Sequence, residues 1–187
     1  LKTVLESAVS LLAGIPSVVY GLVGMLVLVP GIRKVFHLAD GASLLAAIVV
    51  LAIMILPSII KVSVTALEAV PPEYEDASLA LGATPIETYF KVSVPAAKSG
   101  IAAAVVLGVG RAIGETMAVV MIAGNQPILP KSLLSGVRTL TANIVLEMGY
   151  ATDLHREALI ACGVVLFVFI LLINLCFSAV KRKADAT

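Results

Sequence analysis

The chain has 187 residues, of which 60% are hydrophobic and only 13% are charged. Soluble domains carry about a quarter charged residues and need polar side chains to cover their surface, so this composition predicts an integral membrane protein. The net charge of +1 argues against nucleic-acid binding, which requires a strong excess of basic residues. Cys162 and Cys176 share one apolar stretch and are interpreted as packing residues, not as a disulfide or metal pair.

Long uncharged stretches locate the expected membrane spans. Apart from Arg111 and Glu115, charged residues and histidines are absent from residues 7–32, 41–60, 99–124 and 158–180. A helix needs about 20 apolar residues to cross the hydrocarbon core. We therefore expect four transmembrane helices, near residues 8–29, 42–66, 97–124 and 158–180. Backbone polar groups in lipid must be paired within the chain, which favours an all-α bundle forming one transmembrane domain over residues 1–187.

The ends of the chain bear on its completeness and orientation. It begins with Leu1, and its first ten residues lack the features of a signal peptide, so we expect a missing N-terminal portion. A basic tail at 181–183 directly follows the last expected span, which favours a cytoplasmic C-terminus. With four spans, segment 67–96 is then cytoplasmic, and segments 30–41 and 125–157 lie outside.

Backbone irregularities are expected within the spans. Pro16 and Pro57 lie inside predicted helices, where a missing N–H and a steric clash kink or break the helix. Gly110 and Gly114 form a close-approach pattern, which could serve packing within this chain or against a second subunit.

Segment 67–96 predicts a short helix–turn–helix on the membrane face. Acidic residues open it and favour the positive end of a helix. Gly82 is followed by a helix stop, and a new helix starts with Thr84 as its N-cap and Pro85 at its first position. Glu87 has the spacing of a capping box with Thr84. From periodicity alone, this segment could be a solvated connector or a docking element.

The same segment resembles a known family. Permease subunits of ATP-driven bacterial importers carry the motif E-A-A-x-x-x-G-x9-I-x-L-P. This chain has Asp76-Ala77-Ser78, Gly82 four residues later, and Val92-Ser93-Val94-Pro95 after nine more residues. The spacing matches throughout, whereas Asp replaces Glu, Ser replaces the second Ala, and Val replaces Ile and Leu. The resemblance implies a cytoplasmic coupling loop at 67–96, whose ATPase-coupling residues are Asp76, Ala77, Ser78, Gly82, Thr84 and Pro85.

Three further segments resemble the permeases of phosphate importers. These are 12–21 (LAGIPSVVYG), 110–119 (GRAIGETMAV) and 141–150 (TANIVLEMGY), and the last is more similar to the PstC kind of subunit than to PstA. The resemblance implies a transmembrane bundle of the type I ABC importer permease kind, with about four of the usual six spans in this chain.

The resemblance also implies partners and a location. The partners are a PstA-like permease, two PstB-like ATPases and a periplasmic phosphate-binding protein, and the location is the bacterial inner membrane. The sequence contains no G-x-x-x-x-G-K-[ST] phosphate loop, so ATP and Mg are expected in the separate ATPase and no cofactor in this chain. No catalytic residues or metal ligands are assigned, and the chain itself is not expected to be an enzyme.

Arg111, Glu115 and Thr116 are the candidate residues of a substrate path. An arginine within the bilayer costs about 2.5–3.5 kcal/mol on insertion scales, which indicates a partner or an aqueous path. Glu115 follows four residues later, so both side chains are expected on one helix face, where they could simply pair. Alternatively, Arg111 presents its planar guanidinium to a passing oxyanion, and Glu115 prevents the site from trapping it.

These observations lead to one principal hypothesis and three others. The principal hypothesis is a permease subunit of an ATP-driven importer of inorganic phosphate. One alternative keeps the architecture but carries another oxyanion, such as molybdate or sulfate. A second is a secondary transporter driven by an ion gradient. A membrane scaffold without transport is disfavoured by Arg111 and Glu115.

Overall fold

The computed structural model describes residues 2–185, with side chains described for residues 4–179. Its elements are helical, which confirms the all-α prediction. The first half contains α1 (Lys2–Gly14), α2 (Ser17–Val23), the π-helical turn η1 (Gly24–Leu28), α3 (Val29–Val35) and α4 (Leu44–Glu68). The second half contains α5 (Pro72–Ala80), α6 (Pro85–Thr88), the π-helical turn η2 (Tyr89–Ser93), α7 (Val94–Ala96), α8 (Lys98–Ile113), α9 (Met117–Ile122), α10 (Leu140–Glu147) and α11 (Asp153–Asp185).

Three segments are long and apolar enough to cross a membrane: Ser17–Val35, Leu44–Glu68 and Asp153–Ala179. A fourth candidate is the helix pair Pro85–Ala96 and Lys98–Ile113, which is bent by 67°. The expected total of four spans therefore holds when this pair counts as one span. Within the most apolar part of Asp153–Ala179, 6% of residues are buried inside the chain. Its remaining apolar side chains thus face lipid or another subunit.

The first predicted span, 8–29, is wrong in its boundaries. The helix breaks at Ile15 and Pro16, which separates α1 from the candidate span Ser17–Val35. Pro16 has no N–H to donate and disfavours a helical conformation at the residue before it, so a new helix starts after it. Pro57, by contrast, lies buried inside α4, and that helix continues through it.

The third predicted span, 97–124, is also interrupted. α8 ends at Ile113, and the chain leaves the helix before α9 begins at Met117. Two side chains in the break bond to nearby backbone: Thr116 Oγ1 donates to the Gly114 carbonyl at 3.3 Å, and Glu115 Oε1 accepts from the Ala118 N–H at 3.2 Å. Such local bonds offer the backbone an alternative to helical pairing.

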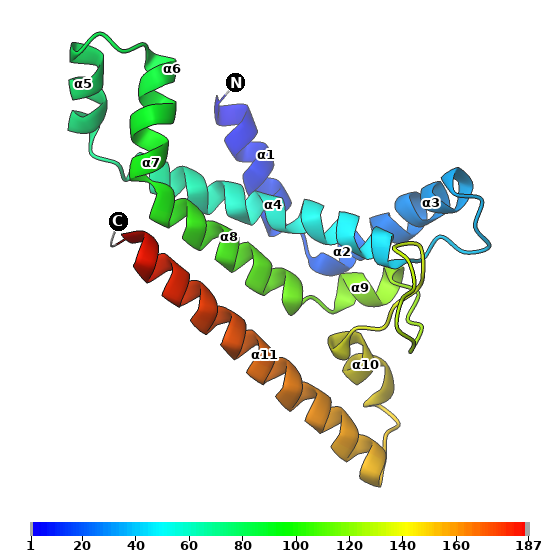
Figure 1. The fold of residues 1–187 in the computed structure, drawn as a ribbon. Helices are drawn as coiled ribbons and strands as arrows, with labels where there is room; N and C mark the ends of the chain where they lie inside the picture. The colour runs from blue at the N-terminus through cyan, green and yellow to red at the C-terminus, as the bar shows by residue number, and fades with distance from the viewer. Residues whose placement is uncertain (1, 186–187) are drawn as a thin grey trace.

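α4 is the central helix of the bundle, and α8 runs antiparallel beside it (Figure 1). Gly108 permits their close approach, because a Cβ there would lie 2.5 Å from Ile59 Cγ1. Past the break, α9 packs against α2 and α4, and α11 follows the length of α8 (Figure 1). The main apolar core is formed by Ile32, Ala46, Ala47, Val50, Ala118, Val119, Ile122 and Ala123.

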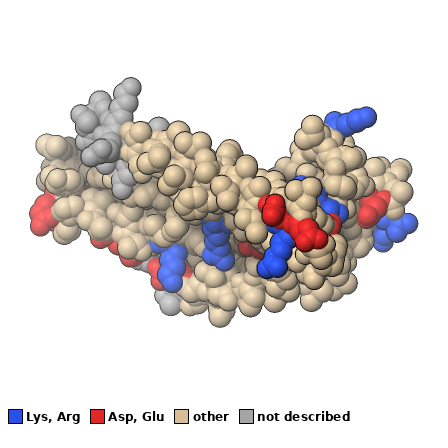
Figure 2. Space-filling model, turned by 90° about the horizontal axis from the view of Figure 1, so that it is seen from below, with Lys and Arg blue, Asp and Glu red and all other residues tan. Residues whose placement is uncertain are grey.

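The two ends of the bundle differ in structure. α5 and α6 stand side by side as a hairpin beyond the last turn of α4 and the first turn of α8, and the C-terminal end of α11 reaches the same end (Figure 1). The loop before α10, together with α10, lies toward the opposite end (Figure 1). On the face seen in Figure 2, most of the surface is neither acidic nor basic, and the charged side chains run in a row across it.

Candidate coupling hairpin and substrate path

The turn of the α5–α6 hairpin has the predicted capping geometry. Thr84 Oγ1 accepts from the Glu87 N–H at 3.3 Å, and Glu87 Oε2 accepts from the Thr84 N–H at 3.1 Å. Pro85 occupies the start of α6, as expected from the sequence. These reciprocal bonds satisfy two N–H groups that a helix start would otherwise leave unpaired. The capping box and the helix–turn–helix prediction are therefore confirmed.

Two polar contacts that the sequence did not reveal hold the hairpin closed. Ser78 Oγ lies 2.9 Å from Thr88 Oγ1, and Ser93 Oγ donates to Glu75 Oε1 at 2.6 Å. Thr88 and Ser93 are buried, although the rest of the hairpin is largely exposed. Ser78 was predicted as a coupling residue, and here it contacts its own hairpin. Its partners could not be identified from sequence because the pairing requires the register of the two helices.

The hairpin exposes both charged and apolar side chains. Asp76 and Ala77 are exposed on α5, Leu81 at the turn is 90% exposed, and Ile86 and Phe90 are also exposed on the second arm. Leu81 lies outside the candidate spans, whereas Ile86 and Phe90 belong to the bent pair that counts as the fourth candidate span.

Arg111 lies near the C-terminal end of α8, and its Nη1 donates to Ser58 Oγ on α4 at 2.9 Å. Its side chain also lines a cavity of about 920 Å³ between α8 and α11. The cavity wall is otherwise mainly small or apolar, and its further polar residues are Ser99, Asn174 and Ser178. Among the residues with described side chains, no carboxylate lies within ion-pair distance of Arg111.

Arg111 and Glu115 do not share a helix face, so the premise of their predicted pairing is wrong. α8 ends between them, and Glu115 serves the start of α9 by accepting from the Ala118 N–H. The Glu115 carbonyl accepts a further bond from Thr141 Oγ1 of α10 at 3.3 Å. Thr116 is likewise occupied within the break, where it bonds to Gly114. Of the three predicted path residues, Arg111 alone borders the α8–α11 cavity among the described residues.

A polar network fastens α10 beside the end of α9. Arg138 Nη1 pairs with Glu147 Oε1 at 2.8 Å, and Arg138 Nε donates to the Asn125 carbonyl at 2.9 Å. A hydrogen bond from the Tyr150 hydroxyl, helped by Arg138, lowers the pKa of Glu147. This network holds α10 against the loop between α9 and α10. It was missed in the sequence because its members are spread over 25 residues without a recognisable spacing.

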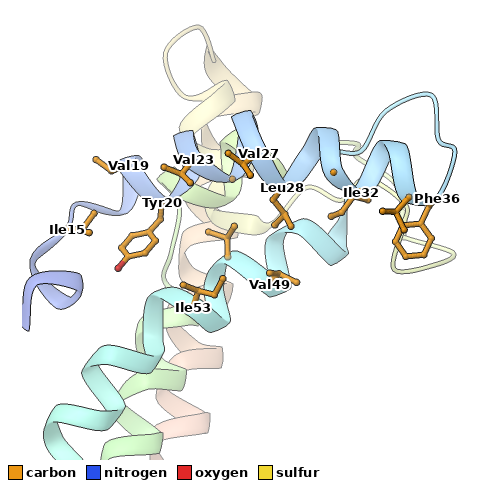
Figure 3. Close-up of a pocket in the computed structure, with 14 residues that line it drawn as sticks. Ile15, Val19, Tyr20, Val23, Val27, Leu28, Ile32, Phe36, Val49 and Ile53 are labelled. Carbon is orange, nitrogen blue, oxygen red and sulfur yellow. The ribbon is translucent and has the colours of Figure 1, made fainter. Parts of the chain in front are cut away.

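A separate groove lies between α2, α3 and α4 (Figure 3). Its volume is about 600 Å³, and its lining is apolar apart from the Tyr20 hydroxyl, which already donates to the Leu12 carbonyl at 2.8 Å. Figure 3 shows the side chains of Val23, Leu28 and Val49 around this groove. With no free donor on its wall, the groove is unsuited to an anion. The α8–α11 cavity is therefore the better candidate for a substrate path.

The fold and the hairpin define the class of protein. A solved structure of the methionine ABC transporter MetNI in an inward-facing conformation matches with a TM-score of 0.73, covering 98% of this chain and 75% of that one. At 20% sequence identity, this likeness establishes the fold alone, which is that of a type I ABC importer permease.

The family follows from sequence comparison. The model of the binding-protein-dependent transport system inner membrane component matches residues 1–185, so the chain belongs to that family. The probable ABC transporter permease protein YqgH of Bacillus subtilis is 45% identical over 188 residues, which cover 97% of this chain and 60% of that protein. The phosphate transport system permease proteins PstC of Xylella fastidiosa and Haemophilus influenzae are 36% and 37% identical over 187 residues, covering 90% of this chain and 58% and 59% of their own lengths. The chain thus spans about 60% of the length of these relatives.

Proposed function

We propose that this chain forms a membrane-spanning permease subunit of an ATP-driven importer of inorganic phosphate in a bacterial inner membrane. The observation that carries the phosphate assignment is the similarity to relatives named phosphate transport permeases over nine-tenths of this chain. The expected partners are a PstA-like permease, PstB-like ATPases that bind ATP and Mg, and a periplasmic phosphate-binding protein. ATP hydrolysis belongs to the ATPase chains, and this chain supplies part of the path.

Arg111 supports an anionic substrate. A guanidinium that lines a cavity and gives one hydrogen bond to a neutral hydroxyl has further N–H donors for an oxyanion. The absence of a second cation beside it among the described cavity-lining residues favours weak, transient binding. Transport requires such weak binding, because a site that holds its ligand too tightly cannot release it.

The α5–α6 hairpin is the proposed coupling element. Its internal bonds make it a stiff unit, and its exposed residues, including Asp76, Ala77 and Leu81, offer a surface to an ATPase. A docking contact that differs between ATPase states shifts the equilibrium between permease conformations. Gly82, Thr84 and Pro85 contribute by fixing the turn.

The proposed orientation places the hairpin and the C-terminus in the cytoplasm. Both lie at one end of the bundle (Figure 1), and the basic tail at 181–183 favours the cytoplasmic side. Single cysteines introduced at 73–90 should then react with an impermeant reagent only from the cytoplasmic side. Cysteines at 131–150 should react only from outside. Labelling of both segments from the same side would refute this orientation.

The transport role of Arg111 is tested by uptake of radiolabelled phosphate, normalised to assembled complex in the membrane. Arg111→Ala should abolish most uptake, and Arg111→Lys should transport poorly, because it keeps the charge but loses the planar donor pair. Glu115→Gln keeps an acceptor for the Ala118 N–H, so assembly should be preserved. Adding it to Arg111→Ala should not rescue transport, since the two side chains are not paired. Normal uptake by Arg111→Ala would remove Arg111 from the path.

The same assay separates the two alternative transport functions. Excess unlabelled sulfate or molybdate should leave phosphate uptake unchanged, and strong competition by either would favour a permease for another oxyanion. Inactivating the ATPase should stop uptake. Uptake that survives this inactivation but stops when the ion gradient is collapsed would favour a secondary transporter.

A further inference from the structure

Among the residues with described side chains, Ser58 is the group on a neighbouring helix that hydrogen-bonds to the Arg111 guanidinium. It projects from α4, and its hydroxyl oxygen accepts from Arg111 Nη1 at 2.9 Å across a sequence separation of 53 residues. Ser58 is half-buried, and it lies directly after the buried Pro57. Its side chain therefore occupies a defined place on the α4 surface that faces α8.

The packing of α4 on α8 fixes this contact. A Cβ at Gly108 would lie 2.5 Å from Ile59 Cγ1, and a Cβ at Gly100 would meet the side chain of Ala66. The two glycines thus bring the helix backbones together at two levels. At one level, Gly108 lies against Ile59, the residue after Ser58, and Gly108 itself is three residues before Arg111. This close approach places the Ser58 hydroxyl level with the guanidinium.

We infer that Ser58 is a positioning residue for Arg111. Its hydroxyl holds Nη1 on the α4 side, which leaves the remaining donors of the guanidinium available to the cavity between α8 and α11. An arginine side chain has many rotamers, and fixing one of them in advance removes the entropy cost of ordering it when an anion arrives. The inference rests on the proposed function, in which Arg111 meets an oxyanion.

The neutrality of Ser58 is part of this role. A carboxylate at this position would neutralise the guanidinium and compete with the anion for its donors. A hydroxyl oxygen accepts from the guanidinium without cancelling its charge. Ser58 thus orients the cation while leaving its attraction for an oxyanion intact.

The test compares Ser58→Ala, Ser58→Thr and Ser58→Cys by initial rates of radiolabelled phosphate uptake per assembled complex. Hydrogen bonds to charged groups contribute more than neutral ones, so Ser58→Ala should lower the initial rate of uptake about 5- to 20-fold. Ser58→Cys keeps a side chain of similar size, but its sulfur is a weak hydrogen-bond acceptor. It should therefore behave like Ser58→Ala. Ser58→Thr keeps the hydroxyl and should retain most of the rate. Ser63→Ala is the matched control, because Ser63 is also half-buried on α4 and does not contact Arg111.

A double-mutant cycle shows whether Ser58 acts through Arg111. In an Arg111→Lys background, Ser58→Ala should change the residual rate less than about 2-fold, because residues that share one interaction are not additive. Equal losses in both backgrounds, or no rescue by Ser58→Thr, would overturn the inference. Loss of assembled protein in both Ser58→Ala and Ser58→Cys would also overturn the inference, because it would show that Ser58 is needed for packing of the helices.

The outcomes for the two proposals are distinguishable. If Arg111→Ala abolishes uptake and Ser58→Ala transports normally, the positioning role is refuted and the proposed path remains. If Arg111→Ala itself transports normally, the proposed path is refuted and the role of Ser58 falls with it.

Discussion

Gly82 controls the turn of the α5–α6 hairpin through its backbone conformation, because its φ is +89°. An L-residue in the left-handed region costs about 1–2 kcal/mol, and Asn tolerates it better than others. No atom lies within 4 Å of a Cβ built at Gly82, so side-chain size should add nothing. Gly82→Ala and Gly82→Leu should therefore raise the equilibrium constant for opening of the turn by the same factor, about 5- to 30-fold. Gly82→Asn should raise it less.

Amide hydrogen exchange of the protein in lipid nanodiscs measures this opening directly. The reporting amides are those of residue 82, which donates to the Leu79 carbonyl at 2.9 Å, and Ala83, which donates to the Ser78 carbonyl at 3.2 Å. Gly149→Ala is the control, because its added Cβ also meets open space and its φ is outside the positive region. Unchanged exchange in Gly82→Ala, or a much larger effect of Leu than of Ala, would refute the conformational argument.

Two further predictions concern packing and the α10 network. Gly108→Ala should reduce the amount of assembled protein, since overpacking typically costs about 1–3 kcal/mol. Gly110→Ala should not reduce it, because the added Cβ meets open space. A quantitative membrane immunoblot compares the amounts of the two variants. The lowered pKa of Glu147 means that its contribution to stability is present above about pH 4.5 and is lost as pH falls through the folded-state value. The protection factors of the α10 amides, which correct for the intrinsic pH dependence of exchange, should therefore fall at acidic pH, and Tyr150→Phe should remove more of that fall than Arg138→Gln. An unchanged pH profile of the protection factors in Tyr150→Phe would contradict the assigned role of Tyr150.

The sequence was most informative where the structure depends on local chemistry. The capping box of Thr84 and Glu87, the turn at Gly82 and the proline at the start of α6 each act over a few residues, so their spacing predicted the hairpin. The uncharged stretches likewise located α4 and α11, because the hydrophobic requirement of a membrane acts on each span separately.

Features that depend on tertiary packing could not be predicted in this way. The break between α8 and α9 places Glu115 at the start of a new helix, although its spacing from Arg111 is that of a helical pair. Hydropathy cannot detect such a break, because both sides of it are apolar. The partner of Arg111 proved to be Ser58, which is 53 residues away and reaches it only through the packing of α4 on α8.

The central claim is that Arg111 presents an uncompensated positive charge to a phosphate ion crossing the membrane. The most direct measurement is ATP-dependent uptake of radiolabelled phosphate into proteoliposomes that contain the assembled transporter, comparing the unmodified protein, Arg111→Lys and Arg111→Ala at equal amounts of complex. We predict strong uptake by the unmodified protein, weak uptake by Arg111→Lys and almost none by Arg111→Ala. Equal phosphate uptake by all three would contradict the account.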